Sequence, residues 1–171
     1  MGFHDDGDAI TELALDALEV AAEGVRRVAG RCGGDARALF EGMVLILESR
    51  TEPWWAPLWR LWNRKPASVR FGAYQNRGKI HLRAGNVNLA VVVHEMGHYL
   101  DEKHHLSRAY RRRLRAAGLR LQTNRFEDMA EALANYVLGR PLDPVRQAYL
   151  EGLRWPGSRP GRVQDPPLPR L

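Results

Sequence analysis

The order of apolar and polar residues divides the chain into helical and extended stretches. Apolar residues recur at helical spacing in four stretches, which predicts helices over about residues 8–30, 106–121, 124–138 and 144–153. A further helix continues from the apolar run Leu89–Val93, and either Asn86 or Asn88 can cap its start. We expect these helices to make up most of the fold.

Shorter stretches predict β-strands. Met43–Leu47 is a continuous apolar run that we interpret as a strand following a helix over residues 35–40, although periodicity alone does not separate a buried strand from a helix end. Val69–Tyr74 and Lys79–Arg83 alternate and flank Gln75–Gly78, which predicts a hairpin with a longer loop. Of these strands, Lys79–Arg83 is the candidate edge strand that could bind an extended substrate. The predicted fold class is α+β, a small mixed β-sheet packed by helices.

Composition changes at two places along the 171 residues. Glu52–Pro66 contains four tryptophans between prolines, which indicates either an aromatic wall for substrate or a satellite core under an irregular loop, and the second is favoured. Residues 154–171 are rich in proline and are expected to form a poorly ordered tail. Residues 1–153 have the length of one domain.

The chain contains no pattern that directs it to a membrane or to an oxidising compartment. Its N-terminus lacks the features of a signal peptide, and no apolar run reaches membrane-spanning length. Cys32 is the single cysteine, so no disulfide can form within the chain. We therefore expect a cytoplasmic protein.

One motif carries most of the chemical information. His94-Glu95-Met96-Gly97-His98 matches the H-E-x-x-H pattern of zinc peptidases. On a helix the two histidines lie one turn apart on the same face, where neutral imidazoles can bind one zinc ion. Glu95 is then placed to act as general base on a water whose pKa the metal lowers to about 7. Asp101, one turn after His98, could orient a ligand imidazole.

A catalytic zinc usually has three protein ligands, and the chain offers two candidates for the third. One is Glu127, which shares a helix face with Glu131, so that one carboxylate could bind zinc while the other hydrogen-bonds a ligand histidine. The other is His104, at the spacing of the longer metzincin pattern. That pattern requires a glycine where this chain has Asp101, so Glu127 is preferred.

Small residues indicate where other groups could approach the motif helix. A glycine within a helix costs about 1 kcal/mol relative to alanine, so Gly97 suggests that something packs close at this position or approaches the metal. Ala130, between Glu127 and Glu131, would let the helix over residues 124–138 lie close to the motif helix.

The segment His94–Asp101, together with the downstream Glu127-Asp-Met-Ala-Glu131-Ala, resembles the gluzincin peptidases. It looks most like the catalytic domain of the anthrax lethal factor type and related small zincins, and the ImmA/IrrE-type peptidases have a similar layout. The resemblance covers roughly residues 68–138. It implies a zincin-like fold in which His94, His98 and Glu127 bind zinc and Glu95 is the general base. Glu131 would contact a zinc-binding side chain without binding the metal itself.

The chain departs from this family at one position. The lethal factor type has an oxyanion-stabilising tyrosine shortly before the third ligand, where this chain has Arg120. Either Arg120, Tyr136, Tyr74 or another group substitutes for that tyrosine, or turnover is weak. The predicted function is a zinc metallopeptidase, most simply an endopeptidase, acting on a protein or peptide substrate.

A different class of function also fits part of the sequence. The net charge is +6, and residues 103–125 contain eight basic residues and no acid. Such a stretch can bind nucleic acid, although it is also typical of a solvated helix face, and nucleic acid is the less favoured partner. The alternative is a zinc-containing nucleic-acid or protein-binding module with little or no peptidase activity.

Overall fold

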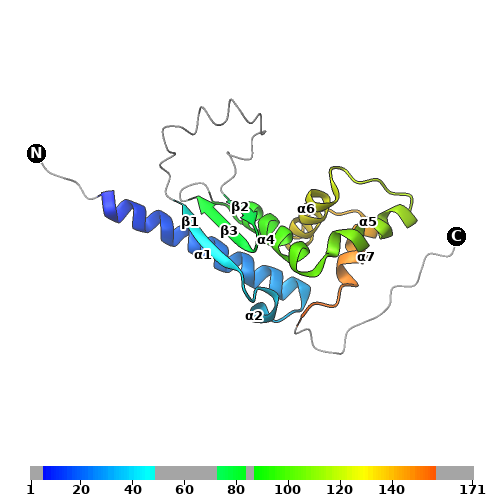
Figure 1. Cartoon of the computed structure of the whole chain (residues 1–171), viewed down its shortest axis with the longest axis horizontal. Coiled ribbons are helices and arrows are strands. Elements are labelled where there is room, and N and C mark those ends of the chain that lie inside the picture. The colour runs from blue at the N-terminus through cyan, green and yellow to red at the C-terminus, as the bar shows by residue number, and fades with distance from the viewer. Residues whose placement is uncertain (1–5, 49–72, 84–86, 157–171) are drawn as a thin grey trace, which may run out of the picture.

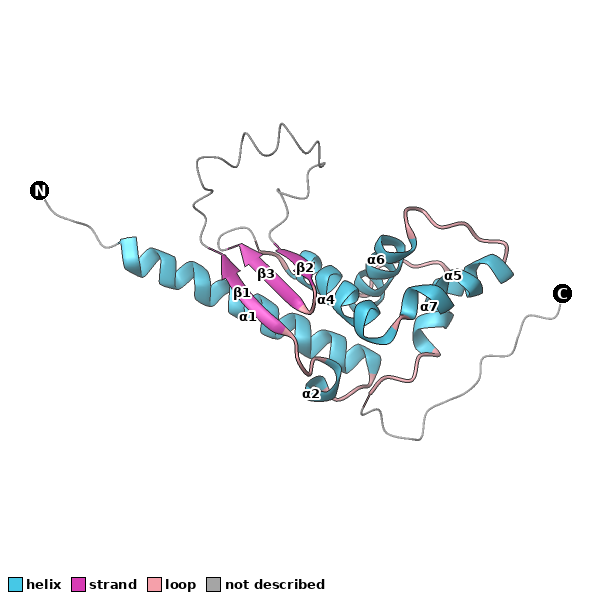
Figure 2. Ribbon diagram, in the orientation of Figure 1, coloured by secondary structure: helices cyan, strands magenta, loops and turns pink. Residues whose placement is uncertain are grey.

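The computed structural model describes residues 6–48, 73–83 and 87–156 (Figure 1). In this part the chain is mostly helical with one small three-stranded sheet, which confirms the predicted mixture of helices and a small mixed sheet (Figure 2). The helices are α1 (Asp6–Cys32), α2 (Ala36–Leu39), α4 (Leu89–His104), α5 (Leu106–Ala116), α6 (Arg125–Val137) and α7 (Pro144–Glu151). The strands are β1 (Val44–Glu48), β2 (Ala73–Asn76) and β3 (Lys79–Arg83).

The sheet corrects two expectations about the hairpin. Only Arg77 and Gly78 separate β2 from β3, and both have positive φ (48° and 76°), which is the conformation that a two-residue hairpin turn requires. The hairpin therefore has a tight turn and not a longer loop. The strand order is β1-β3-β2, so β3 lies in the centre of the sheet and is not the edge strand. β1 pairs with β3 in parallel and β2 pairs with it antiparallel.

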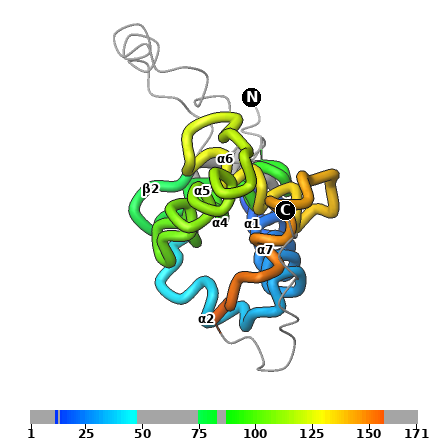
Figure 3. The backbone as a smooth tube through the Cα atoms, turned by 90° about the vertical axis from the view of Figure 1, so that its right-hand side faces the viewer, coloured from blue at the N-terminus to red at the C-terminus, as the bar shows by residue number. Residues whose placement is uncertain are grey.

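Helix α4 lies at the centre of the fold. It packs against α1, α6, β2 and β3, and its buried side chains include Val92, Val93, Met96 and Leu100. Figure 3 shows α5 and α6 beside α4, with α7 next to them. Because one side of α4 is held in this core, the opposite side can present polar residues in a fixed orientation.

The end of the domain lies further along the chain than the proline content suggested. Trp155 is 5% exposed and belongs to the hydrophobic core, and the carbonyl of Pro156 accepts a hydrogen bond from Asp35 N (3.2 Å). Residues 154–156 are therefore part of the fold. The rest of the proline-rich tail and the tryptophan-rich segment Glu52–Pro66 lie outside the described residues. No helix in the described ranges is long and apolar enough to cross a membrane.

Candidate metal centre and active site

The start of α4 fixes the orientation of the motif. Asn88 has an extended backbone, and its side-chain oxygen accepts a hydrogen bond from Val91 N (3.0 Å), which caps the helix. His94 and His98 follow on one face and lie half-buried at the edge of a cleft. Their Nε2 atoms are 3.1 Å apart. The helix therefore aims both imidazoles at one point, as the spacing of the motif predicted.

Helix α6 brings a carboxylate to the same point. Asn124 caps this helix by accepting hydrogen bonds from the backbone N–H groups of Phe126 (3.0 Å) and Glu127 (3.1 Å). The Oε2 atom of Glu127 lies 3.2 Å from His94 Nε2, and its Oε1 atom lies 3.4 Å from His98 Nε2. One donor atom from each of the three side chains lies within 4.8 Å of the others, so His94, His98 and Glu127 form a candidate metal-binding triad.

The close approach of the two helices depends on two small residues. A Cβ atom added to Gly97 would lie 3.0 Å from Ala130 Cα and 3.2 Å from Ala130 Cβ, closer than almost all real Cβ contacts. A side chain at Gly97 would therefore require α6 to shift by a few tenths of an ångström, which agrees with the close packing that a glycine within the helix suggested. Contact between the backbones of α4 and α6 at this point is what allows Glu127 to reach the histidines.

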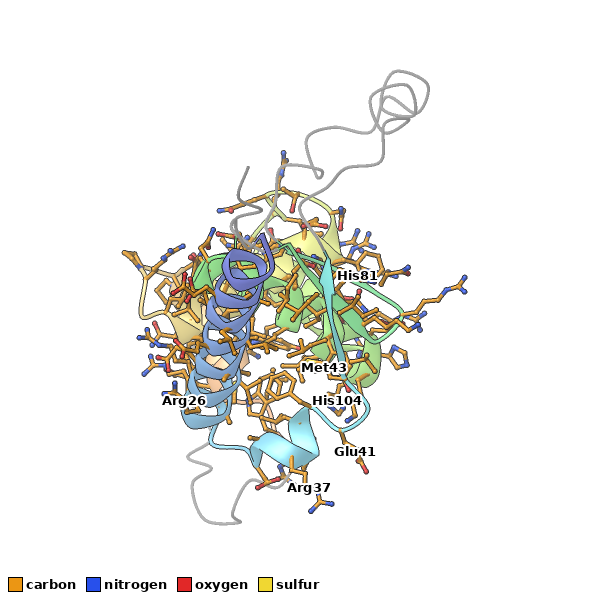
Figure 4. All side chains as sticks on the ribbon, turned by 90° about the vertical axis from the view of Figure 1, so that its left-hand side faces the viewer. Arg26, Arg37, Glu41, Met43, His81 and His104 are labelled. Atoms are coloured by element: carbon orange, nitrogen blue, oxygen red, sulfur yellow. The ribbon has the colours of Figure 1, made fainter. Side chains whose placement is uncertain are left out.

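His104 is not part of the triad. Helix α4 continues through Asp101 and ends at His105, which has left-handed backbone geometry (φ 54°). His104 does not line the cleft, and in Figure 4 it is drawn close to Met43 and Glu41. The neighbouring Lys103 donates a hydrogen bond to the carbonyl of Glu41 (2.9 Å), which places this side of the helix against the connection between α2 and β1.

Two carboxylates were expected to support the histidines, and the structure places them differently. Glu131 Oε2 lies 3.4 Å from His94 Nδ1, the ring nitrogen that faces away from the triad, and its other oxygen accepts from Asn135 Nδ2 (3.1 Å). Glu131 is thus positioned to orient His94. Asp101 Oδ1 instead accepts a hydrogen bond from the backbone N–H of Ser107 (2.6 Å), at the start of α5. The negative charge of Asp101 still raises the pKa of His98, but its hydrogen bond stabilises the turn into α5.

Burial and the neighbouring charges shape the electrostatics of the motif. Burial, followed by the charge of His94, lowers the pKa of His98, and Glu127 partly opposes this shift. Burial also raises the pKa of Glu95 to about 7, against the hydrogen bond from Gln75 N to its Oε2 (2.8 Å), while the charge of Glu127 adds to the increase. The site therefore favours a neutral His98 and a Glu95 that can exchange a proton near neutral pH.

A cleft of about 920 Å³ lies over the triad and is lined by residues of β2, the following turn, α4, α5 and α6. Sequence reasoning missed several of these residues. Gln75, which holds Glu95, could not be found without knowing the register of the hairpin. Phe126 lines the cleft next to Glu127, and its side chain is 47% exposed. Its place between the charged residues Arg125 and Glu127 at the start of a helix is a sequence signal that could have identified it as a cleft residue.

Two of the expected oxyanion partners, Arg120 and Tyr136, do not line the cleft. The side chain of Arg120 is exposed, and its carbonyl accepts a hydrogen bond from Arg146 Nη2 (3.1 Å). Tyr136 is buried, with the guanidinium of Arg31 over its ring at 4.6 Å. Neither residue lines the cleft. The side chain of Tyr74 lies outside the described part of the chain.

Comparison of the chain with models of protein families, with curated proteins and with solved structures found no match.

Proposed function

We propose that the chain is a zinc-dependent peptidase of zincin-like architecture, which holds its metal with His94, His98 and Glu127. The observation that carries this proposal is the convergence of these three donors beside Glu95, from two helices that meet at Gly97. Two ligand atoms each about 2.0–2.1 Å from a tetrahedral zinc lie about 3.3 Å apart. The 3.1 Å between the two Nε2 atoms fits that spacing, and each histidine has one oxygen of Glu127 at a similar distance: Oε2 is 3.2 Å from His94 Nε2, and Oε1 is 3.4 Å from His98 Nε2.

The composition of the triad favours a catalytic site over a structural one. Structural zinc is normally enclosed by four protein ligands, whereas catalytic zinc has three and keeps a position open for water. The described residues supply three donors, and these face a cleft that is large enough for a peptide segment. When bound, zinc would lower the pKa of a water molecule and polarise the carbonyl of the scissile bond.

Glu95 supplies the proton transfer in this proposal. Its Oε2 atom accepts the hydrogen bond from Gln75 N, which fixes the carboxylate and leaves Oε1 as the atom that can take a proton from the attacking water. The same carboxyl group then gives that proton to the leaving amine as the C–N bond breaks.

The edge strand β2 is the element that we expect to bind substrate, in place of β3. The N–H group of Gln75 points to Glu95 and away from β3, so the outer edge of β2 faces the active site. The carbonyl of Gln75 lies on the same edge, because both groups of one residue point to the same side of a strand. An extended peptide could pair with this edge and pass across the triad.

Cleavage of a peptide library by the wild-type chain and by Glu95→Gln tests the proposal. We expect zinc-loaded wild type to cleave and Glu95→Gln to lose roughly 10²-fold or more in rate, since it retains the shape of the site but not the base. Both proteins should hold the same amount of zinc. Equal cleavage by the two would rule out Glu95 as the base, and no cleavage by either would favour a binding module that contains zinc.

A further inference from the structure

Four arginines line the cleft in the described part of the chain, and three of them gather at one of its ends, while Arg140 follows α6 at the other. His94 lies near Glu131 and His98 lies near Glu127, so α6 runs antiparallel to α4 across the triad. The cleft therefore extends from the C-terminal end of α4, where α5 and α6 begin, to its N-terminal end. At the end of the cleft nearest the C-terminus of α4 lie three arginines: Arg77 on the hairpin turn, Arg108 in the first turn of α5 and Arg125 at the start of α6. We call this the arginine end.

The carboxylates that line the cleft are already engaged. Glu102 accepts hydrogen bonds from Gly78 N (3.1 Å) and Gln75 Nε2, so it holds the hairpin against α4. Asp101 accepts from Ser107 N (2.6 Å). The remaining three belong to the site described above, where Glu95 accepts from Gln75 and both Glu127 and Glu131 lie against His94. None of these five acids is bonded to an arginine of the cleft in the part of the chain that the structure describes.

The arginines, by contrast, have no acidic partner within the described ranges. The Arg77 and Arg108 side chains are exposed. The guanidinium of Arg125 lies over the ring of Phe126 at 4.5 Å, and its Nε is buried without a hydrogen-bond acceptor. The planar fork of donors on arginine matches a carboxylate closely.

We propose that the preferred substrates of this site carry an acidic side chain, which binds at the arginine end of the cleft. This inference rests on the proposed peptidase function and names its substrate class. Phe126 offers an exposed ring against Arg125, so an apolar residue next to the acidic one fits this end as well.

A peptide fits the charge distribution better than a nucleic acid does. A nucleic acid carries a negative charge at every phosphate and would follow the cleft past Glu95, Glu127 and Glu131. Fewer basic residues line this middle part of the cleft than its arginine end, so a continuous row of phosphates would meet no matching row of cations there. A peptide can place one carboxylate among the arginines while its uncharged backbone crosses the triad.

Binding to the zinc-loaded Glu95→Gln variant tests this inference without requiring turnover. The probes are short fluorescein-labelled peptide pools that differ only in whether their fixed positions carry Glu, Gln or Lys, and the readout is fluorescence anisotropy. We expect the Glu pool to bind most tightly. Adding Arg108→Glu should weaken binding of the Glu pool by about tenfold or more and strengthen binding of the Lys pool. The matched control is Arg115→Glu, an exposed position on α5 outside the cleft, which should change little.

The outcomes separate this inference from the proposed function. Equal binding of the three pools, or tightest binding of the Lys pool, would overturn the inference even if wild type cleaves peptides. Tighter binding of single-stranded DNA than of the Glu pool, lost with Arg108→Glu, would also overturn it. If wild type cleaves nothing yet the Glu pool binds through Arg108, the acidic site stands and the peptidase function fails. If Arg108→Glu does not fold, Arg77→Glu on the hairpin turn provides the same test.

Discussion

At the scale of single residues, the site depends on which atom of each side chain is already occupied. His94 directs Nε2 to the triad and Nδ1 to Glu131 (3.4 Å), so both ring nitrogens have a defined environment. Such a contact fixes the orientation of a ligand imidazole and raises its basicity. Glu131 is in turn held by Asn135 on the next turn of α6. One face of α6 thus supplies both a donor of the candidate triad, Glu127, and a carboxylate that is placed to orient His94, Glu131.

This arrangement predicts a graded response to substitution. Glu131→Gln should lower zinc affinity by roughly 10–100-fold, because the amide orients His94 less strongly than a carboxylate does. Zinc affinity measured by competition with a chromogenic chelator checks the prediction. Glu19→Gln makes the same chemical change at an exposed position of α1 and serves as the control. An affinity unchanged by Glu131→Gln would show that the contact with His94 has no role in metal binding.

The sequence predicted those parts of the site that follow from local geometry. The spacing of His94 and His98 is enough to place them on one face of a helix, and Glu131 follows Glu127 by one turn. It did not predict the hydrogen bond of Asp101. That bond exists because the chain reverses at His105, a non-glycine residue with φ 54°, and returns Ser107 N to the carboxylate. A left-handed residue other than glycine is uncommon and has no clear sequence signal.

At the scale of elements, the contact between α4 and α6 decides whether a third ligand is available. Gly97 faces Ala130 so closely that a further carbon atom on Gly97 would require α6 to move by a few tenths of an ångström. Since Glu127 and Ala130 lie on the same helix, any increase in the distance between the two helices also moves the carboxylate away from the histidines. The site is therefore sensitive to a single methyl group placed outside it.

Gly97→Ala should separate these helices and weaken metal binding. We expect zinc affinity to fall about tenfold or more and the free energy of unfolding to drop by about 1–3 kcal/mol, the usual cost of overpacking. Gly30→Ala is the matched control, since a Cβ at Gly30 of α1 meets nothing within 4 Å. That change should be neutral or stabilise by up to about 1 kcal/mol. Equal effects of the two substitutions would contradict the role assigned to the contact.

The sheet shows where element-level prediction from sequence stops. Alternation identified β3, and the apolar run identified β1, because both signals are local. The position of a strand within a sheet depends on which distant segments pair with it. Val44 pairs with Lys79 in parallel, which places β3 between its two neighbours and leaves β2 at the edge beside α4. No periodicity within Lys79–Arg83 reports that pairing, so the expected edge strand was wrong.

At the scale of the whole molecule, a buried polar network joins α5, α6 and α7 behind the site. Asp128 accepts hydrogen bonds from Tyr110 OH (2.6 Å) and Gln122 N (2.5 Å), and Arg146 Nη2 lies 3.2 Å from its Oδ2. Burial raises the pKa of Asp128, but the hydrogen bonds from Arg146, Tyr110 and Gln122 outweigh this and lower it below its ordinary value. Asp128 follows Glu127 directly, so the network also holds the start of α6 in place.

Asp128→Asn should destabilise the fold by about 3–5 kcal/mol, because it leaves the charge of Arg146 buried without its partner. Urea unfolding followed by circular dichroism measures the change. Asp16→Asn makes the same substitution at an exposed position of α1 and is expected to stay within about 0.5 kcal/mol of wild type. Similar stability losses for the two variants would indicate that the network contributes nothing beyond a surface carboxylate.

The proposed function depends on the binding of one zinc ion to His94, His98 and Glu127, and the metal content of the purified chain tests this binding. Elemental analysis should find about one zinc per chain in wild type and in His104→Ala, and far less in Glu127→Ala or His98→Ala. Removing the metal with a chelator should lower the melting temperature of wild type, since a ligand that binds only the folded state stabilises it. Wild type that is free of zinc and indifferent to the chelator, or zinc lost in His104→Ala but kept in Glu127→Ala, would contradict the account.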